Sequence, residues 1–294
     1  MYDKYLDRTI YIYVLKTKNL NVQIAGDCLP KGKFKLHSAF ANAANFINSS
    51  SEVLGLVNNH ENITPNALCI PGVDFSAISC IEVDDLYIFI EHNKIERSRV
   101  PEFESEIRFS KDEIFKIENL LKNIRTVSIS SIPQKSLMAL YFPQLESQFS
   151  SGFDKAFLCQ SKLAFQQFQN GKVLEGIAMF RGIGYGFTPS GDDFNAGFLF
   201  GLNILEEKFD KDFSEFKHQV YNIAKGGNPV VNTFLLLAMQ ARYFNRLKKT
   251  LFLLPGKDKT ATSEAFQPLL MHGETSGADL LAGLITAVHY KTIL

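Results

Sequence analysis

The apolar residues of the first hundred positions fall into short runs that are rich in β-branched and aromatic side chains. These runs cover residues 9–15, 22–25, 52–57, 67–70, 79–83 and 86–91. Turn-forming residues such as Pro71 and Gly72 separate the runs, and strands at this spacing are typical of a small sandwich or barrel. Asp84 and Asp85 lie between two apolar runs and predict a tight hairpin. Residues 40–46 predict a short turn or helix instead.

The spacing of apolar residues becomes helical after about residue 110. Ser110 and Glu113 form the capping-box pattern that opens a helix. Further helices are predicted at 136–145, 153–169, 172–180, 192–207, 213–224, 232–245, 263–271 and 278–290. The sequence therefore predicts an α+β protein. A β-rich N-terminal domain at residues 1–109 precedes a larger, mainly α-helical domain at residues 110–294 that carries the glycine-rich motifs.

Composition narrows the class of protein. The chain has 294 residues, with 31 Lys+Arg and 31 Asp+Glu, so it lacks the overall positive charge that would suggest a nucleic-acid partner. No apolar run approaches the length of a membrane helix, and the N-terminus lacks the pattern of a secretory signal. The cysteines, at 28, 69, 80 and 159, form no C-x-x-C pair. We expect a cytoplasmic protein with reduced thiols rather than disulfides or a thiolate metal site.

The most unusual stretch is residues 181–197, which read RGIGYGFTPSGDDFNAG. Gly182, Gly184 and Gly186 alternate there, so the backbone is free of Cβ constraint and can approach a ligand closely. Thr188 and Ser190 carry hydroxyls that can cap the first turn of a following helix, and free amides at such a turn can bind an anion. The alternative is a loop that only caps the helix.

This motif has an echo near the C-terminus. Residues 276–283, SGADLLAG, align without a gap with residues 190–197, SGDDFNAG, and five of the eight positions are identical. In this register Asp193 corresponds to Asp279, and the small residues at 197 and 201 correspond to those at 283 and 287. Positions four apart share one helix face, so we expect the two helices to pack closely on each other.

The loops before the two helices are also similar. Gly186 and Thr188 correspond to Gly273 and Thr275 when Pro189 is treated as an insertion. If the two helices pack in parallel, both aspartates and both helix N-termini converge on one place. Such a place would suit a substrate or a Mg²⁺ ion. The alternative is that each aspartate caps its own helix and the small residues serve packing alone.

Other sequence signals are weaker. His272 directly precedes Gly273 and could act as a proton donor in the same site, or it could be an ordinary loop histidine. Residues 226–229, followed by Asn232 and Thr233, form a turn into the helix predicted at 232, and its polar caps either face the same cleft or only cap the helix. The chain contains no zinc-hydrolase H-E-x-x-H spacing, no P-loop and no G-x-S-x-G elbow.

The two C-terminal motifs, together with residues 40–46 (FANAANF) and Thr64-Pro-Asn66, resemble the AllH-like family of bacterial proteins. That family, long of unknown function, includes a subunit of the oxamate carbamoyltransferase of anaerobic allantoin breakdown. The resemblance covers most of the chain and implies a role in purine-nitrogen catabolism with companion subunits. There, phosphate splits oxalurate into oxamate and carbamoyl phosphate. Family members more often carry Leu at the position of Phe187, and Pro is common at that of Tyr185.

The motifs and the resemblance together select the candidate site residues. Catalytic roles are predicted for Asp192, Asp193, Asp279 and His272, and a metal, if present, for Asp193 and Asp279. The predicted binding residues for a small anionic substrate are Arg181, Gly184, Gly186, Thr188, Ser190, Gly191, Thr275, Ser276 and Gly277. Carboxylates would repel an anion, so either a Mg²⁺ bridges the two or a partner subunit supplies the catalytic groups. Arg181 suits bidentate recognition of carboxylate or phosphate.

Two functional hypotheses follow. In the first, the chain is an enzyme or a catalytic subunit for small carbamoyl or carboxylate metabolites, with its site at the two S-G-x-D helix starts. In the second, it is a non-catalytic assembly or ligand-binding subunit, either with companion subunits or as a homo-oligomer, and the glycines serve helix packing. Neither hypothesis involves nucleic acid or a membrane.

Overall fold

The computed structural model describes residues 20–122, 124, 128–253 and 262–289. The chain forms two compact units that divide between Ser105 and Glu106. The strand predicted at 9–15 lies outside the described residues. No disulfide joins the four cysteines, and of these Cys69 is buried.

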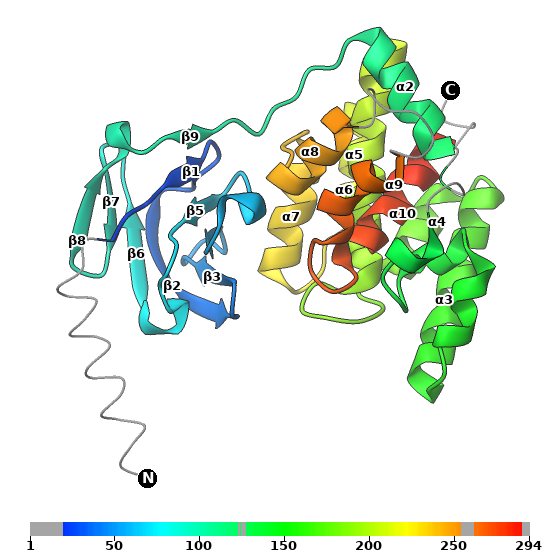
Figure 1. The fold of residues 1–294 in the computed structure, drawn as a ribbon, viewed down its shortest axis with the longest axis horizontal. Coiled ribbons are helices and arrows are strands. Elements are labelled where there is room, and N and C mark those ends of the chain that lie inside the picture. Colours follow the sequence, from blue (N-terminus) through cyan, green and yellow to red (C-terminus); the bar gives the residue numbers. More distant parts are fainter. Residues whose placement is uncertain (1–19, 123, 125–127, 254–261, 290–294) are drawn as a thin grey trace. The chain divides into compact units, whose positions relative to one another are not determined.

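The N-terminal unit is a curled sheet that contains nine strands in the described part of the chain (Figure 1). The strands are β1 Ile24–Gly26, β2 Gly32–Ala39, β3 Ala43–Ile47, β4 Val53–Val57, β5 Ala67–Cys69, β6 Cys80–Val83, β7 Tyr87–Ile90, β8 Asn93–Glu96 and β9 Glu102–Phe103. Their order across the sheet is β8-β7-β6-β2-β3-β4-β5-β1-β9, and only β4–β5 and β1–β9 are parallel pairs among the described strands. The concave face encloses a core that includes Phe34, Phe46 and Ile81.

Residues 40–46 do not form the predicted turn or helix alone, because a strand, β3, begins at Ala43. Ala44 and Phe46 are buried while Asn45 between them is half-buried, which is the two-residue alternation of a strand. Asn45 also donates from Nδ2 to the hydroxyl of Ser38 on β2, at 3.0 Å. The predicted hairpin at Asp84 and Asp85 is confirmed, since it joins the antiparallel pair β6 and β7.

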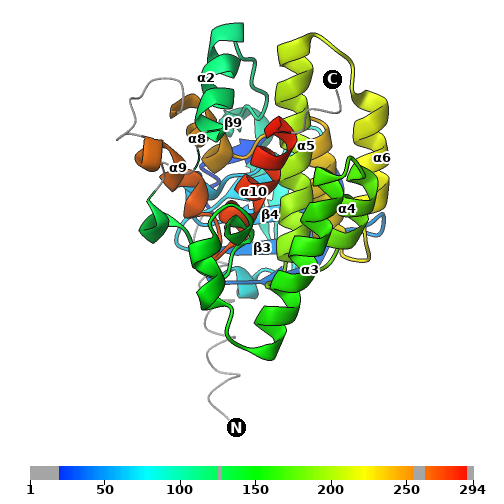
Figure 2. The same cartoon turned by 90° about the vertical axis from the view of Figure 1, so that its right-hand side faces the viewer.

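The second unit is helical, as predicted (Figures 1 and 2). Its described helices are α2 Lys111–Lys122, α3 Gly152–Gln169, α4 Val173–Phe180, α5 Ser190–Phe209, α6 Ser214–Ala224, α7 Pro229–Met239, α8 Asn245–Leu253, α9 Thr262–Leu270 and α10 Ser276–His289. The capping box at Ser110 is confirmed, because its hydroxyl accepts the Glu113 amide while the Glu113 carboxylate accepts the Ser110 amide.

Two of the predicted helices are wrong in extent. The helix expected at 136–145 is replaced by two 3₁₀ turns, η6 Leu137–Leu140 and η7 Pro143–Gln148. Pro143 has no amide hydrogen to continue the first turn, and it forces Phe142 out of the helical region. The helix expected at 232–245 ends at Met239, and Ala241 takes a left-handed conformation with φ of 55° before α8 begins.

Helices α5 and α10 lie side by side and in parallel at the centre of this unit (Figure 2). A Cβ placed on Gly197 would lie 1.9 Å from the carbonyl oxygen of Leu280, and one on Gly283 would lie 1.9 Å from that of Phe194. Farther along, a Cβ on Gly201 would lie 2.4 Å from that of Ala287. The two backbones are therefore in direct contact, as the stripe of small residues predicted.

The helix pair belongs to a structural repeat of helix, loop and helix. In the first copy the Gly191 amide donates to the Ile183 carbonyl, and in the second the Gly277 amide donates to the His272 carbonyl, both at 2.9 Å. Each first helix also contributes a carbonyl that a Cβ on Gly191 or Gly277 would strike. The repeat thus extends from α4–α5 to α9–α10.

The structure corrects one detail of the predicted alignment of the loops. The Pro189 carbonyl accepts the amides of Asp192 and Asp193, and the Thr275 carbonyl accepts those of Ala278 and Asp279. Pro189 therefore occupies the position of Thr275, and it is not an insertion. The extra residues of the first loop lie before it.

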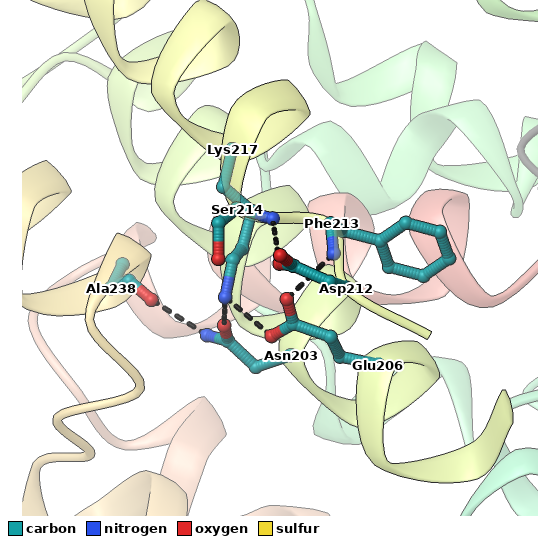
Figure 3. Close-up of polar contacts among 7 residues, drawn as sticks. All are labelled: Asn203, Glu206, Asp212, Phe213, Ser214, Lys217 and Ala238. Carbon is teal, nitrogen blue, oxygen red and sulfur yellow. Dashed lines mark hydrogen bonds and ion pairs between the residues drawn. The ribbon is translucent and has the colours of Figure 1, made fainter. Parts of the chain in front are cut away.

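The C-terminal half of α5 is linked to α6 and α7 by a buried polar cluster (Figure 3). Lys217 on α6 forms an ion pair with Glu206 and donates to Asn203 Oδ1 at 2.9 Å. Asn203 in turn donates to the Ala238 carbonyl of α7 at 2.7 Å. Because these buried polar groups are mutually satisfied, the cluster fixes three helices without leaving a charge unpaired.

In the described part of the chain, no helix has the length and apolar character that a membrane span requires.

The contact between α5 and α10 predicts which glycines the fold requires. We expect Gly197→Ala and Gly283→Ala each to lower the free energy of unfolding by about 2–4 kcal/mol, because a new methyl group would strike a backbone that cannot yield. Gly152→Ala on α3 is the matched control. Its Cβ would meet nothing within 4 Å, so its effect should be neutral or stabilising by up to about 1 kcal/mol. Chemical denaturation of the three variants tests this, and equal effects at all three positions would contradict it.

Candidate functional site

The first turns of α5 and α10 bring together four polar residues of the repeat, which are Ser190, Asp193, Ser276 and Asp279. Ser190 and Asp279 are fully buried, and Asp193 is 3% exposed. The carboxyl group of Asp193 accepts hydrogen bonds from the Ser276 hydroxyl of the other helix and from Thr188 Oγ1, the latter at 3.4 Å. Thr188 Oγ1 also lies 3.4 Å from Ser276 Oγ. The two helix starts are thus joined through their side chains.

The second carboxyl group, that of Asp279, has a related environment. Its Oδ1 accepts the backbone amide of Leu137 at 2.6 Å, which anchors η6 to the start of α10. The hydroxyls of Thr275 and Ser190 also stabilise its charged form. Its Oδ2 is buried and has no hydrogen-bond partner among the described residues. Each aspartate therefore contacts a serine of the opposite helix, and neither simply caps its own helix.

Burial makes both of these carboxyl groups weak acids. Burial raises the pKa of Asp279 to about 7, even though the Leu137 amide and two hydroxyls act in the opposite direction. Burial and the neighbouring Asp279 carboxylate raise the pKa of Asp193 well above its ordinary value. Two adjacent carboxyl groups in such a place do not both ionise readily. The pair therefore holds at least one proton near neutral pH.

Asp192 faces a different neighbour. Its Oδ1 accepts the Gly182 amide at 2.8 Å, and so it ties the glycine-rich loop to the helix that follows. Burial raises its pKa to about 6, against the Gly182 hydrogen bond and the Arg181 charge, which lower it. Arg181 itself is exposed and donates from Nη1 to the Ile223 carbonyl at 3.3 Å. Substrate recognition by this arginine stays a prediction.

The glycine-rich loop, residues 181–188, presents backbone amides at the start of α5. Gly182, Gly184 and Gly186 all take left-handed conformations, with φ of 72°, 107° and 86°. No described group accepts the amide hydrogens of Gly184 and Gly186. The amides of Gly191 and Gly277 differ, because each already donates to a carbonyl of its own repeat. The close approach at these two glycines is therefore to backbone, and their amides are not available to a ligand.

Several helix N-termini surround this loop. Asn228, which caps α7, donates to the Phe187 carbonyl at 3.2 Å, and Tyr185 donates to Asp154 in the first turn of α3. With α5 and α10, the amino ends of α3 and α7 thus lie next to the loop. Their combined dipoles favour negative charge there.

The second loop contains His272, whose predicted role was proton donation. Its ring packs on Phe244, with ring centroids 4.6 Å apart. Burial and the nearby Arg246 charge lower its pKa to about 4, so the imidazole is neutral at pH 7. A neutral imidazole donates only a neutral N–H, and a proton-donating role for His272 stays a prediction.

The metal prediction gains no support from the described residues. No three His, Cys, Asp or Glu side chains among them are arranged to hold a metal ion. Asp193 and Asp279 supply only two carboxyl groups, which already accept hydrogen bonds from hydroxyls and an amide. A bound Mg²⁺ therefore stays a prediction.

Sequence reasoning missed the residues that hold the loop from outside. Asp154 meets Tyr185 of the glycine-rich loop, and Leu137 meets Asp279 of the second motif, only in the folded chain. Ser151 and Asp154 do form a capping box that could have been recognised in the sequence. Nothing local indicates that Tyr185 would reach it.

The carboxyl pair predicts an unusual dependence of stability on pH. Folded Asp279 keeps its proton up to about pH 7, whereas the unfolded chain releases it near the ordinary value of 3.8. The free energy of unfolding should therefore fall as pH rises from about 4 to about 7. Asp279→Asn should flatten this fall and stabilise the protein by about 1–3 kcal/mol at pH 8. Thermal melts from pH 4 to pH 8 measure both effects.

Asp154→Asn is the matched control for that series. Hydrogen bonds from Tyr185 and Ser151 and the Lys135 ammonium hold the Asp154 pKa below its ordinary range. Its charge therefore stabilises the fold near neutral pH, and its removal should destabilise the protein there. If Asp279→Asn kept the wild-type profile between pH 4 and pH 7, the protonated carboxyl pair would be disproved.

Comparison with known proteins shows that the part of the chain with both motifs is similar to a known family. No curated protein and no solved structure matched. Residues 180–288 match the model of the family described as oxamate carbamoyltransferase subunit AllH. The match leaves out the β unit and helices α2 and α3, so it is shorter than the resemblance expected from the motifs. It begins at the last residue of α4 and ends in the last turn of α10. The segment that carries both loops and both S-G-x-D helix starts is therefore similar to the AllH subunit of oxamate carbamoyltransferase.

Proposed function

We propose that the chain is a subunit of an enzyme of the oxamate carbamoyltransferase type, and that its glycine-rich loop binds a small carboxylate or carbamoyl anion. The observation that carries this proposal is the pair of amides at Gly184 and Gly186, which no described group accepts. They precede α5 within the segment that is similar to the AllH subunit. Oxamate, oxalurate and carbamoyl phosphate are all small anions that such amides can bind.

Electrostatics supports an anion at this place. The amino ends of four helices adjoin the loop, and each favours a negative charge. The carboxyl groups of Asp193 and Asp279 would oppose it most strongly if both were ionised. Since burial keeps at least one proton on this pair near neutral pH, their repulsion of an anion is reduced without any metal. Asp192, whose pKa is raised to about 6, still adds repulsion near pH 7, so the conflict between the acidic residues and an anionic substrate is smaller but not removed.

The same pair can take part in the chemistry. When phosphate splits oxalurate, the bond between the carbamoyl carbon and the oxamate nitrogen breaks, a phosphate oxygen bonds to that carbon, and the nitrogen needs a proton. A carboxylic acid with a pKa of about 7 is matched to giving and regaining a proton at neutral pH. We assign this role to Asp279, whose Oδ2 has no other partner among the described residues. Companion subunits would complete the site.

One set of contacts favours the alternative of a non-catalytic assembly or ligand-binding subunit. Gly191, Gly197, Gly277 and Gly283 all lie against backbone carbonyls, so helix packing alone accounts for them. Asp192 and Asp279 likewise each accept an amide of a neighbouring segment. A Cβ on Gly184 would likewise lie 2.7 Å from that of Ser190 and 2.9 Å from the Phe157 ring. One on Gly186 would meet only the Thr188 carbonyl, at 3.4 Å, so packing does not explain Gly186 and the test concerns that residue.

Gly186 allows a matched test of anion binding. It is exposed and has a positive φ, which Asn and Asp tolerate better than other residues. Gly186→Asp adds a negative charge beside the amides and should weaken binding of oxamate and of inorganic phosphate by at least about tenfold. Gly186→Asn keeps the amide without the charge and should bind within about threefold of wild type. Isothermal titration of the purified chain measures both, and equal binding by the two variants would refute the anion site.

The catalytic part of the proposal has a separate test. Release of carbamoyl phosphate from oxalurate and phosphate is measured with the chain alone and with its companion subunits. Asp279→Asn should retain anion binding and lose turnover by about 10²-fold or more, because Asn cannot supply the proton. Turnover at the wild-type rate would leave the chain as the non-catalytic subunit of the alternative hypothesis.

A further inference from the structure

Tyr185 lies between Gly184 and Gly186, whose amides no described group accepts, and its side chain leaves the loop. Its ring packs edge-on between Phe153 and Phe157 of α3, with ring centroids 5.2 Å and 5.1 Å away. Its hydroxyl donates to Asp154 Oδ1 at 2.5 Å. Burial and the Asp154 carboxylate raise the pKa of the tyrosine, so the hydroxyl stays protonated and remains a donor.

The acceptor of this hydrogen bond is itself rigidly held. Asp154 is 2% exposed and belongs to the capping box of α3. Its Oδ2 accepts the amides of Ser150 and Ser151 and forms an ion pair with Lys135 Nζ at 3.0 Å. These partners keep the carboxylate ionised and fix its position. A charge-assisted hydrogen bond to such an acceptor is stronger than one between neutral groups.

The backbone around Tyr185 needs an external anchor. Gly184 and Gly186 have no side chains to restrict them, so the loop by itself would sample many conformations. Asp192 fixes its beginning at Gly182, and Asn228 holds Phe187 near its end. Between these two points the Ile183 carbonyl accepts the Gly191 amide, and the Tyr185 amide donates to Ser190 Oγ at 3.5 Å. The Tyr185 side chain is the contact that ties this segment to α3.

We propose that Tyr185 is a positioning residue for the anion site, acting through its hydrogen bond to Asp154. This inference rests on the proposed function, because it concerns the same loop. By fixing the peptide groups on both sides of it, Tyr185 arranges the amides of Gly184 and Gly186 before the anion arrives. Loss of the anchor would require the anion to order the loop on binding, and that ordering lowers affinity.

Tyr185→Phe tests the anchor, with Tyr141→Phe as its control. Both variants remove one tyrosine hydroxyl of the helical unit, since Tyr141 bonds Thr286 Oγ1 at 2.7 Å. Both should lower the melting temperature, Tyr185→Phe the more because its hydroxyl bonds a carboxylate. Only Tyr185→Phe should raise the Kd for oxamate and for inorganic phosphate, by about tenfold. It alone should also speed hydrogen exchange of the amides of residues 182–187 by about tenfold or more.

The outcomes separate the inference from the proposed function. If the wild type binds the anions and Tyr185→Phe binds them equally well, the positioning role is overturned and the anion site stands. If hydrogen exchange in the loop is unchanged in Tyr185→Phe, the anchor itself is overturned, whatever the binding data show. If the wild type binds neither anion, the proposed function fails and the positioning role fails with it. Faster exchange would then show an anchor that serves the fold alone.

Discussion

The structure of the helical unit depends on one close contact, the parallel packing of α5 against α10. Gly197 and Gly283 each lie against a carbonyl of the other helix, so the two backbones touch with no side chain between them. Parallel helices in contact also place like ends of their dipoles together, which is unfavourable at both ends. Acidic side chains in the first turns can compensate at the amino ends only while they are ionised, so the burial that raises the pKa values of Asp193 and Asp279 weakens this compensation.

That compensation has consequences for the chemistry of the site. The helix starts are buried, so the carboxyl groups that serve them lose their hydration and become weak acids. Asp279, which lies at these buried helix starts, can therefore hold and release a proton near pH 7. Structural and chemical roles for Asp193 and Asp279 are therefore compatible, and stability measurements alone do not distinguish them. Stability across pH, anion binding and turnover together do.

Different residues of the glycine-rich motif have different roles. Gly191 serves the contact between α4 and α5, and Asp192 ties the beginning of the loop to the helix. Gly184 and Gly186 remain with amides that no described group accepts, while Tyr185 between them reaches Asp154 on α3. The loop is thus anchored through its ends, the Ile183 carbonyl and the Tyr185 side chain, and these contacts would hold its backbone in one conformation for the proposed anion.

The sequence by itself determined the α+β class, most of the helices, the glycine stripe and the correspondence of Asp193 with Asp279. Each of these depends on local periodicity or on a repeated pattern, which a linear chain displays directly. The runs of apolar residues did not predict β2, although its alternation of Lys33, Phe34, Lys35 and Leu36 is typical of a strand, and helical periodicity did not predict the break at Pro143. Only the tertiary structure decided that the Gly191 amide is already used, that His272 is neutral, and that Tyr185 meets Asp154. These properties depend on burial and on which distant segments supply partners, because an amide, an imidazole or a hydroxyl is the same group in the sequence whatever surrounds it in the fold.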